Sequence, residues 1–311
     1  MLDKFVVGIK GSYRTHPLPD LPNFKVVDWE NQDIIEKADV FVQANILENK
    51  FFRKFRAQYE HIRDSGKPYI VVESSVFRRN MPFPPNPKAY HRWSWTSYFR
   101  DEGNYCNENC PDDRWKQIQK DQNIEIKDWK KGGEYILLAM QRPGDSSLKN
   151  LMAKHKTFDN FIANTIAEIR KYSDRPIVAR MHPARMDRQR QALAKIDTSG
   201  ITVSKNMHGS GNLEGGAGLY EDFKNAYAVV GFNSNALTES ICEGIPTFSL
   251  CPSSMAWEVS NKDLSTLEKP EYFERINWLH NLAYCQWRED ECKAGLPWEH
   301  LKKVYQDIIS K

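Results

Sequence analysis

Short apolar runs alternate with longer amphipathic stretches along most of the chain. In the first part, the runs at 4–9, 24–29, 39–44 and 68–73 predict short buried strands. A helix is predicted over 47–64 because bulky apolar residues recur there at helical spacing: Phe51, Phe52, Phe55, Tyr59 and Ile62. Strands alternating with helices favour a parallel sheet covered by helices.

A second alternating series follows residues 74–131, where periodicity is lost and Pro and Trp are frequent, as in a long functional loop. The series predicts strands at 134–140, 176–181, 201–204 and 228–230, and helices at 157–172, 185–194 and 219–226. From Pro270 the pattern is helical, with a break near Gly295 and Pro297. The predicted fold class is α/β, with two Rossmann-like doubly wound domains at 1–131 and 132–269 and C-terminal helices at 270–311.

The segment 228–250 combines a strand, a polar turn, a short helix and a second strand. The first strand ends at Gly231, and Asn233, Ser234 and Asn235 then bring amide and hydroxyl groups to the start of the helix. Backbone N–H groups and the positive dipole end suit a phosphate or carboxylate there. Glu239, one turn later, could accept hydrogen bonds from a ribose diol. The alternative is a simple helix cap, which any α/β protein contains.

Two other predicted strands end in basic residues. Arg142 and Asp145 follow the strand at 134–140, and Arg180 and His182 close the strand at 176–181. Ligands of open parallel sheets bind outside the carboxyl ends of the strands. Arg142 and Arg180 could pair with diphosphate oxygens, and His182 could donate to a phosphate or a sugar. Taken singly, each residue is more often structural.

These motifs carry a resemblance to a known group of enzymes. The His-Pro pair in RMHPAR (180–185), followed by GFNSNALTESICEGIP (231–246), resembles the donor-binding domain of GT-B fold glycosyltransferases. Within that group the chain looks most like phage-encoded enzymes that attach sugars to modified bases in DNA. The resemblance covers roughly 112–301, whereas residues 1–90 match no family that we can name. The same motifs are also similar to sialyl- and Kdo-transferases that use CMP-sugars.

The resemblance implies a hexosyl- or pentosyltransferase. It would move a sugar from a nucleotide sugar, expected to be a UDP-sugar, to a hydroxymethylated base such as 5-hydroxymethylcytosine in double-stranded DNA. The first domain would bind the acceptor, the second would bind the donor, and the C-terminal helices would pack back on the first domain. No metal is strictly required, because Asp112 and Asp113 are adjacent in a loop and form no convincing DxD motif. A bacteriophage origin and a place in the host cytoplasm would follow.

The acceptor surface is predicted from charge. Residues 51–100 carry ten Lys or Arg against three Asp or Glu, a net charge of +7, interleaved with aromatic rings. Such a mixture can hold phosphates and stack on bases. The candidate DNA-binding residues are Arg53, Arg78, Arg79, His91, Arg92, Trp93 and Trp95. The alternative is a solvated helix face followed by aromatic residues that pack on the core.

The catalytic base is expected among acids of the first domain. Glu73, at the end of the predicted strand 68–73, is the first choice, and Asp101 in the following loop is the second. The alternative role for Glu73 is an ion pair with Arg78 or Arg79.

The composition bears on the cellular environment in which we expect the protein. No apolar run approaches the roughly 18 residues that a membrane helix needs, and the first apolar run is interrupted too early for a signal segment. Six dispersed cysteines fit a reducing, cytoplasmic environment, and Cys106 and Cys110 have no second pair at zinc spacing. We expect a monomer.

The competing functions are a surface-polysaccharide glycosyltransferase using a UDP- or CMP-sugar, a nucleotide-sugar 2-epimerase, and a non-catalytic nucleic-acid-binding protein.

Overall fold

The computed structural model describes residues 4–10, 17–19, 21–44, 53–77, 88–206 and 215–310. The chain forms two compact units. Unit 1 comprises Met1–Val76, Met81–Gln117 and Leu279–Lys311, and unit 2 comprises Phe77–Asn80 and Ile118–Trp278. Helices α3 (Asp113–Gln122) and α9 (Ile276–Ala283) contain the boundaries between them.

Unit 1 contains a six-stranded sheet in the order β11-β5-β4-β3-β1-β2. Four strands are parallel: β1 (Val6–Ile9), β2 (Phe24–Val27), β3 (Val40–Ala44) and β4 (Tyr69–Ser74). The other two pair antiparallel: β5 (Tyr90–Trp95) with β4, and β11 (Gln286–Arg288) with β5. The helices of this unit are α1 (Gln32–Ile35), α2 (Arg53–Asp64), α10 (Glu289–Lys293), α11 (Leu296–Leu301) and α12 (Tyr305–Ile309).

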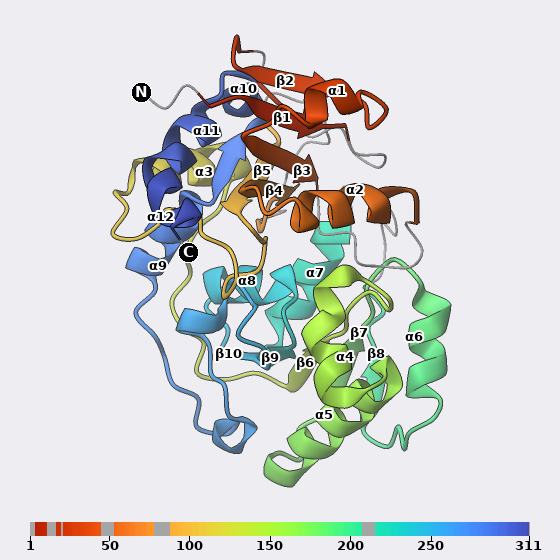
Figure 1. The fold of residues 1–311 in the computed structure, drawn as a ribbon. Coiled ribbons are helices and arrows are strands. Elements are labelled where there is room, and N and C mark those ends of the chain that lie inside the picture. The colour runs from red at the N-terminus through yellow and green to blue at the C-terminus, as the bar shows by residue number, and fades with distance from the viewer. Residues whose placement is uncertain are drawn as a thin grey trace. The chain divides into compact units, whose positions relative to one another are not determined.

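The core of unit 1 joins residues from both ends of the chain. Val6, Val42 and Val72 of the central strands share one buried cluster with Trp95 and with Trp298 of α11. Figure 1 shows the C-terminal helices in blue beside the first strands in red. The apolar strand residues are therefore covered by helices that come last in the sequence.

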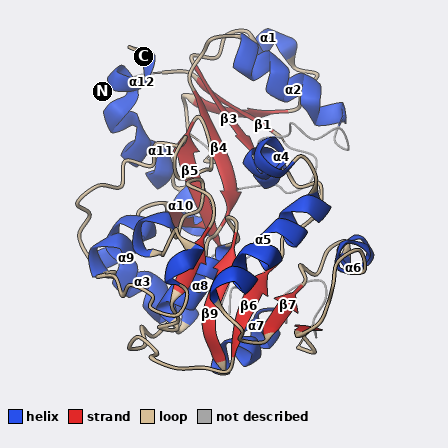
Figure 2. Ribbon diagram, turned by 90° about the horizontal axis from the view of Figure 1, so that it is seen from below, coloured by secondary structure: helices blue, strands red, loops and turns tan. Residues whose placement is uncertain are grey.

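Unit 2 contains a five-stranded, fully parallel sheet in the order β10-β9-β6-β7-β8. Figure 2 shows its strands β9, β6 and β7 side by side. The strands are β6 (Tyr135–Ala139), β7 (Ile177–Arg180), β8 (Ile201–Val203), β9 (Ala226–Gly231) and β10 (Thr247–Ser249). The helices are α4 (Lys149–His155), α5 (Phe158–Tyr172), α6 (Met186–Leu193), α7 (Gly215–Lys224) and α8 (Asn235–Cys242). Helix α5 covers the sheet because its buried residues recur at a spacing of three and four: Phe158, Phe161, Ile162, Thr165, Ile166 and Ile169.

The prediction of two Rossmann-like α/β units is confirmed, but two regions differ from the sequence pattern. Residues 74–131 are not one long loop, since they contain β5 and the whole of helix α3. All six residues of β5 are buried, so the strand lacks the alternation that marks a half-exposed strand. The terminal region is not purely helical, since it supplies the three-residue edge strand β11.

The unit boundaries also differ from the expected limit at residue 131. Residues that follow α3 bond to unit 2: the Lys127 N–H donates to the Cys242 carbonyl at 2.9 Å, and the Lys127 ammonium pairs with Glu243. These contacts agree with the place of 118–131 in unit 2. The functional roles of the two domains stay predictions.

Candidate functional site

The carboxyl ends of three neighbouring strands lie together at one edge of the unit 2 sheet. Gly231 at the end of β9 pairs with Ala139 of β6, and Ala139 pairs with Arg180 at the end of β7. Because adjacent strands are about 4.8 Å apart, the turns that leave β9 and β7 begin about 10 Å from one another. All eight predicted donor-binding residues lie in these strands, in the turns after them, or in α8.

Asn233 ties these turns together. Its Nδ2 donates to the Ser147 carbonyl and to Ser253 Oγ, both at 2.9 Å. Its Oδ1 accepts from Gln141 Nε2 at 2.6 Å, and its backbone N–H donates to Gln141 Oε1 at 2.9 Å. The amide of Asn233 is thus engaged by protein groups, which makes it a residue that positions the sheet edge. Its predicted contact with phosphate stays a prediction.

Helix α8 begins at the same edge. Ser234 is its N-cap and accepts from the Ala236 N–H at 3.3 Å, and Asn235 is the first helical residue. The positive end of the helix dipole lies here, where an anion is stabilised. The structure therefore has the helix start that the sequence predicts.

Arg142 and Asp145 lie in the turn after β6. Their closest charged atoms, Nη1 and Oδ2, are 3.9 Å apart, and both side chains are about one third exposed. Asp145 also caps the short helix Ser146–Leu148 by accepting from the Ser147 N–H at 3.0 Å. A partly exposed pair at this separation contributes only about 0–1 kcal/mol. The Arg142 guanidinium can therefore turn to a diphosphate at little cost in stability, whereas Asp145 has a structural role.

Arg180 belongs to a buried polar network. Its guanidinium forms an ion pair with Asp222 of α7 and donates to the carbonyls of Asn206 and Gly218 at 3.0 and 3.1 Å. Asp222 also accepts from Ser204 Oγ. Arg180 is 8% exposed and Asp222 is 2% exposed. This arrangement assigns Arg180 a structural role, because a diphosphate would have to displace a buried carboxylate to reach it.

His182 is exposed in the turn between β7 and α6. Its Nδ1 accepts from the Ala184 N–H at 3.0 Å. A backbone N–H can only donate, so the proton of the neutral ring lies on Nε2. The ring therefore presents Nε2–H as a donor, as a contact with phosphate or sugar requires.

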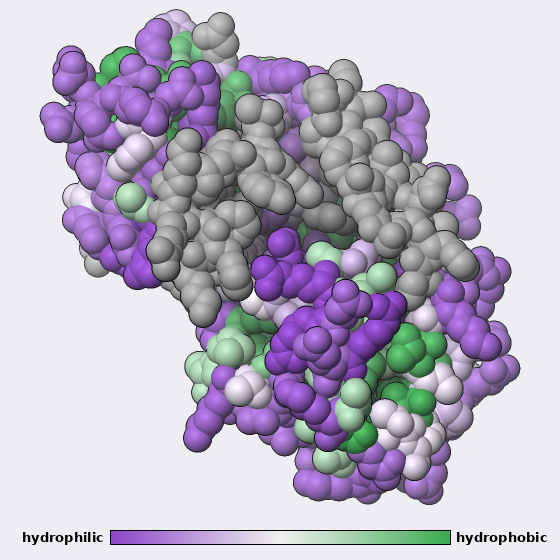
Figure 3. Space-filling model, turned by 90° about the vertical axis from the view of Figure 1, so that its right-hand side faces the viewer, coloured by the Kyte–Doolittle hydropathy of each residue, from purple (hydrophilic) through white to green (hydrophobic). Residues whose placement is uncertain are grey.

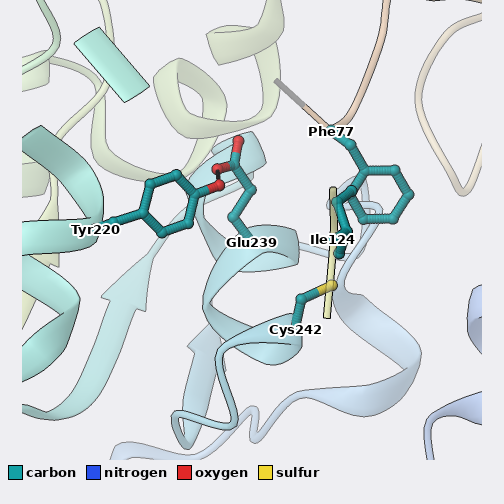
Figure 4. Close-up of a pocket in the computed structure, with 5 residues that line it drawn as sticks. All are labelled: Phe77, Ile124, Tyr220, Glu239 and Cys242. Carbon is teal, nitrogen blue, oxygen red and sulfur yellow. Dashed lines mark hydrogen bonds between the residues drawn. The ribbon is translucent and has the colours of Figure 1, made fainter. Parts of the chain in front are cut away.

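Glu239 lies on a small pocket of unit 2 (Figure 4). The pocket is lined by Phe77, Ile124, Tyr220, Glu239 and Cys242, and its empty volume of about 180 Å³ is partly open to solvent. The Tyr220 hydroxyl donates to Glu239 Oε2, and Glu239 is 6% exposed. That volume includes open solvent, and the enclosed space is only about 10 Å³, which is room for about one water molecule and not for a nucleotide.

The predicted acceptor residues in unit 1 need a correction. His91, Arg92, Trp93 and Trp95 all lie on β5 and are 3%, 6%, 0% and 0% exposed. The Arg92 Nε–H donates to the Ser74 carbonyl, and the Trp95 indole N–H donates to the Leu301 carbonyl at 2.9 Å. Stacking on a base requires an exposed ring face. These rings therefore belong to the core, and the prediction that they bind DNA is wrong.

The other acceptor candidates fall outside what the structure describes. Arg53 begins α2, but its side chain is not among the described atoms, and Arg78 and Arg79 lie outside the described residues.

The two candidate bases also lie in unit 1. Glu73 is the next-to-last residue of β4, and its Oε1 accepts from the Ser74 N–H at 2.6 Å and from Ser74 Oγ at 2.8 Å. Asp101 is exposed in the turn after β5. Glu73 is held by the strand end, whereas Asp101 is not anchored in a regular element.

Several residues of this site were missed from the sequence. Gln141, Gln189, Tyr220 and Asp222 hold Asn233, His182, Glu239 and Arg180, respectively. Gln141 directly follows the predicted strand at 134–140, so its position was a usable signal. The other three act across long intervals of sequence or inside a helix, and no local pattern marks them.

Among the described residues, no three His, Cys, Asp or Glu side chains are grouped as metal ligands. Burial raises the pKa of the Cys106 and Cys110 thiols to about 11. Within the same residues, no helix is long and apolar enough to cross a bilayer. On the face in Figure 3, hydrophilic side chains predominate and the hydrophobic areas are small.

Comparison with known proteins adds to this geometry. No protein-family model and no curated protein matches the chain. Among solved structures, it is similar to the beta Kdo 2,4 transferase of Thermosulfurimonas dismutans KpsC, with 14% identity, 90% of each chain covered and a TM-score of 0.55. The beta Kdo 2,7 transferase of the same KpsC gives 12% identity, 96% of this chain and 99% of that chain covered, and a TM-score of 0.52.

The chain has the GT-B type fold. At these identities the similarity establishes the fold alone, and it extends over nearly the whole chain. A Methanocaldococcus jannaschii UDP-GlcNAc 2-epimerase structure has a TM-score of 0.33, with 15% identity and 80% and 76% of the two chains covered.

Proposed function

We propose that the protein is a glycosyltransferase that takes its sugar from a nucleotide sugar. The observation that carries the proposal is the edge of the unit 2 sheet, where a helix start, Arg142 and the Nε2–H of His182 follow three adjacent parallel strands. Cations and N–H donors at such an edge suit a phosphate group. The GT-B type fold supports the same conclusion by analogy.

The proposed reaction needs a base and a group that stabilises the leaving nucleotide. We assign the base to Glu73, which would take the proton of the acceptor hydroxyl as its oxygen attacks the anomeric carbon. The bond from that carbon to the nucleotide phosphate then breaks, and Arg142 and the start of α8 would stabilise the negative charge that develops on the phosphate. Asp101 is the alternative base.

A saccharide is the acceptor that we favour. The two similar structures are Kdo transferases by name, and the burial of β5 removes four residues from the predicted DNA-binding surface. A hydroxymethylated base in double-stranded DNA is the second candidate, because residues 51–100 carry a net charge of +7. Part of that charge is already paired, as in Arg56 with Glu60 and Arg63 with Asp64.

Donor and acceptor can be tested separately. The protein would be incubated with UDP-sugars and CMP-sugars, including CMP-Kdo, and with either saccharides or hydroxymethylated and unmodified DNA, and the products identified by mass spectrometry. Transfer to a saccharide supports the first candidate, and a glycosylated nucleoside supports the second. If none of the donors shifts the melting temperature and no combination gives a product, the proposal is contradicted.

Tyr220 and Glu239 should contribute to donor affinity. If the Glu239 carboxylate accepts from the ribose hydroxyls, Glu239→Gln should weaken donor binding about 10- to 100-fold, since a hydrogen bond to a charged group contributes about 1.5–3 kcal/mol. Tyr220→Phe removes the hydroxyl that orients the carboxylate and should have a smaller effect. Titration calorimetry with a ribonucleotide and its 2′,3′-dideoxy analogue would measure both. If Glu239→Gln weakens the binding of the two nucleotides equally, Glu239 does not contact the ribose.

A further inference from the structure

The turn that carries His182 is held by a single buried amide. Gln189, in α6, is 0% exposed. Its Oε1 accepts from the His182 N–H at 2.8 Å, and its Nε2 donates to the His182 carbonyl at 2.8 Å. The same Nε2 lies 3.0 Å from the Ala184 carbonyl and 3.3 Å from the Arg185 carbonyl. One side chain thus bonds to the backbone of three of the four residues in 182–185.

The backbone of this turn is strained and lacks a side-chain cap. Arg185 precedes α6 in the left-handed conformation, with φ 60° and ψ 40°, and it provides no side-chain cap. For a residue other than Gly or Asn this conformation costs about 1–2 kcal/mol. Gln189 bonds to the backbone of the residues that precede the helix, and so it stabilises the strained turn from inside the helix.

The orientation of the imidazole depends on this turn. The Ala184 N–H can reach His182 Nδ1 only while residues 182–184 keep their backbone conformation, and that bond places the ring proton on Nε2. We propose that Gln189 is a positioning residue: by fixing residues 182–185 it keeps His182 as the Nε2–H tautomer that donates to the phosphate or sugar of the donor. The contact with the donor rests on the proposed function, whereas the effect on the tautomer does not.

The first test needs no ligand. Nitrogen-15 NMR of the histidine-labelled protein would report the His182 tautomer, with the signal assigned by its loss in His182→Gln. We expect an unprotonated Nδ1 and a protonated Nε2 in the wild type, and signals of both tautomers in Gln189→Met. Should Gln189→Met fail to fold, Gln189→Glu replaces it, because its carboxylate still accepts from the His182 N–H but cannot donate to the three carbonyls. An unchanged tautomer in a folded Gln189 variant overturns the proposal.

The second test uses UDP and CMP as probes in calorimetry. His182→Gln places an amide N–H near the former Nε2, whereas His182→Asn keeps only a group near the former Nδ1. We expect His182→Asn and the Gln189 variant to weaken binding about 10-fold, as for one lost hydrogen bond, and His182→Gln to retain most of the affinity. Equal losses in His182→Gln and His182→Asn overturn the Nε2 contact. If the wild type binds neither nucleotide, the proposed function itself fails, while the tautomer result stands on its own.

Discussion

Glu73→Gln is expected to lower turnover about 10²- to 10⁴-fold, the usual contribution of a general base, and to leave donor affinity unchanged. Glu73 Oε1 accepts two hydrogen bonds from Ser74. The amide oxygen of a glutamine can accept the same bonds, so the variant should keep the native strand end. Rates under saturating donor and acceptor, together with the donor dissociation constant, would separate chemistry from binding.

Asp101→Asn is the matched control for this experiment. Asp101 is exposed in a turn, and its replacement should leave turnover within about twofold if Glu73 is the base. A normal rate in Glu73→Gln combined with a large loss in Asp101→Asn would transfer the role to Asp101. Normal rates in both variants would show that neither Glu73 nor Asp101 is the catalytic base.

Arg180→Met is expected to lower the free energy of unfolding by about 3–5 kcal/mol, because it leaves the buried Asp222 carboxylate without its cation. The double variant Arg180→Met/Asp222→Asn should recover part of this loss, since the neutral amide retains most of the size of Asp222 and carries no buried charge. Urea unfolding of the wild type and of the single and double variants would measure the coupling.

Arg142→Met supplies the contrast. Arg142 is partly exposed and lies 3.9 Å from its acidic partner, so its loss should change stability by less than about 1 kcal/mol while weakening donor binding about 10-fold or more. The opposite pattern, with Arg180→Met stable but deficient in donor binding, would restore Arg180 to the donor site and contradict its structural assignment.

The fold was largely predictable from sequence because its strands are short apolar runs separated by amphipathic helices. Strand β4 and helix α5 lie within one or two residues of the predicted limits. The pattern failed at β5, where Trp93 and Trp95 are interleaved with a buried His, Arg and Ser. Arg92 donates to the Ser74 carbonyl and Ser94 donates to the Ser97 carbonyl inside the unit, and no local pattern reveals the long-range partner of Arg92.

The position of the candidate site in the fold could be predicted from the sequence, whereas the binding roles of its residues stay predictions. Strand order and the helix start brought Arg142, His182 and Ser234 to one sheet edge, as the motifs indicated. A basic residue at that edge is available to a ligand only if no buried acidic residue of the protein already pairs with it. Arg180 has Asp222, 42 residues away in sequence, and no spacing rule connects the two.

The edge strand β11 also affects how the chain folds during synthesis. The β5 edge of the unit 1 sheet is completed only when residues 286–288 have left the ribosome, whereas unit 2 is finished at Trp278. The Trp95 indole N–H gains the Leu301 carbonyl that it bonds to in the finished protein later still, when α11 has been synthesised. Translation should therefore release a folded second unit before the first one can close, the reverse of the order in which domains usually mature.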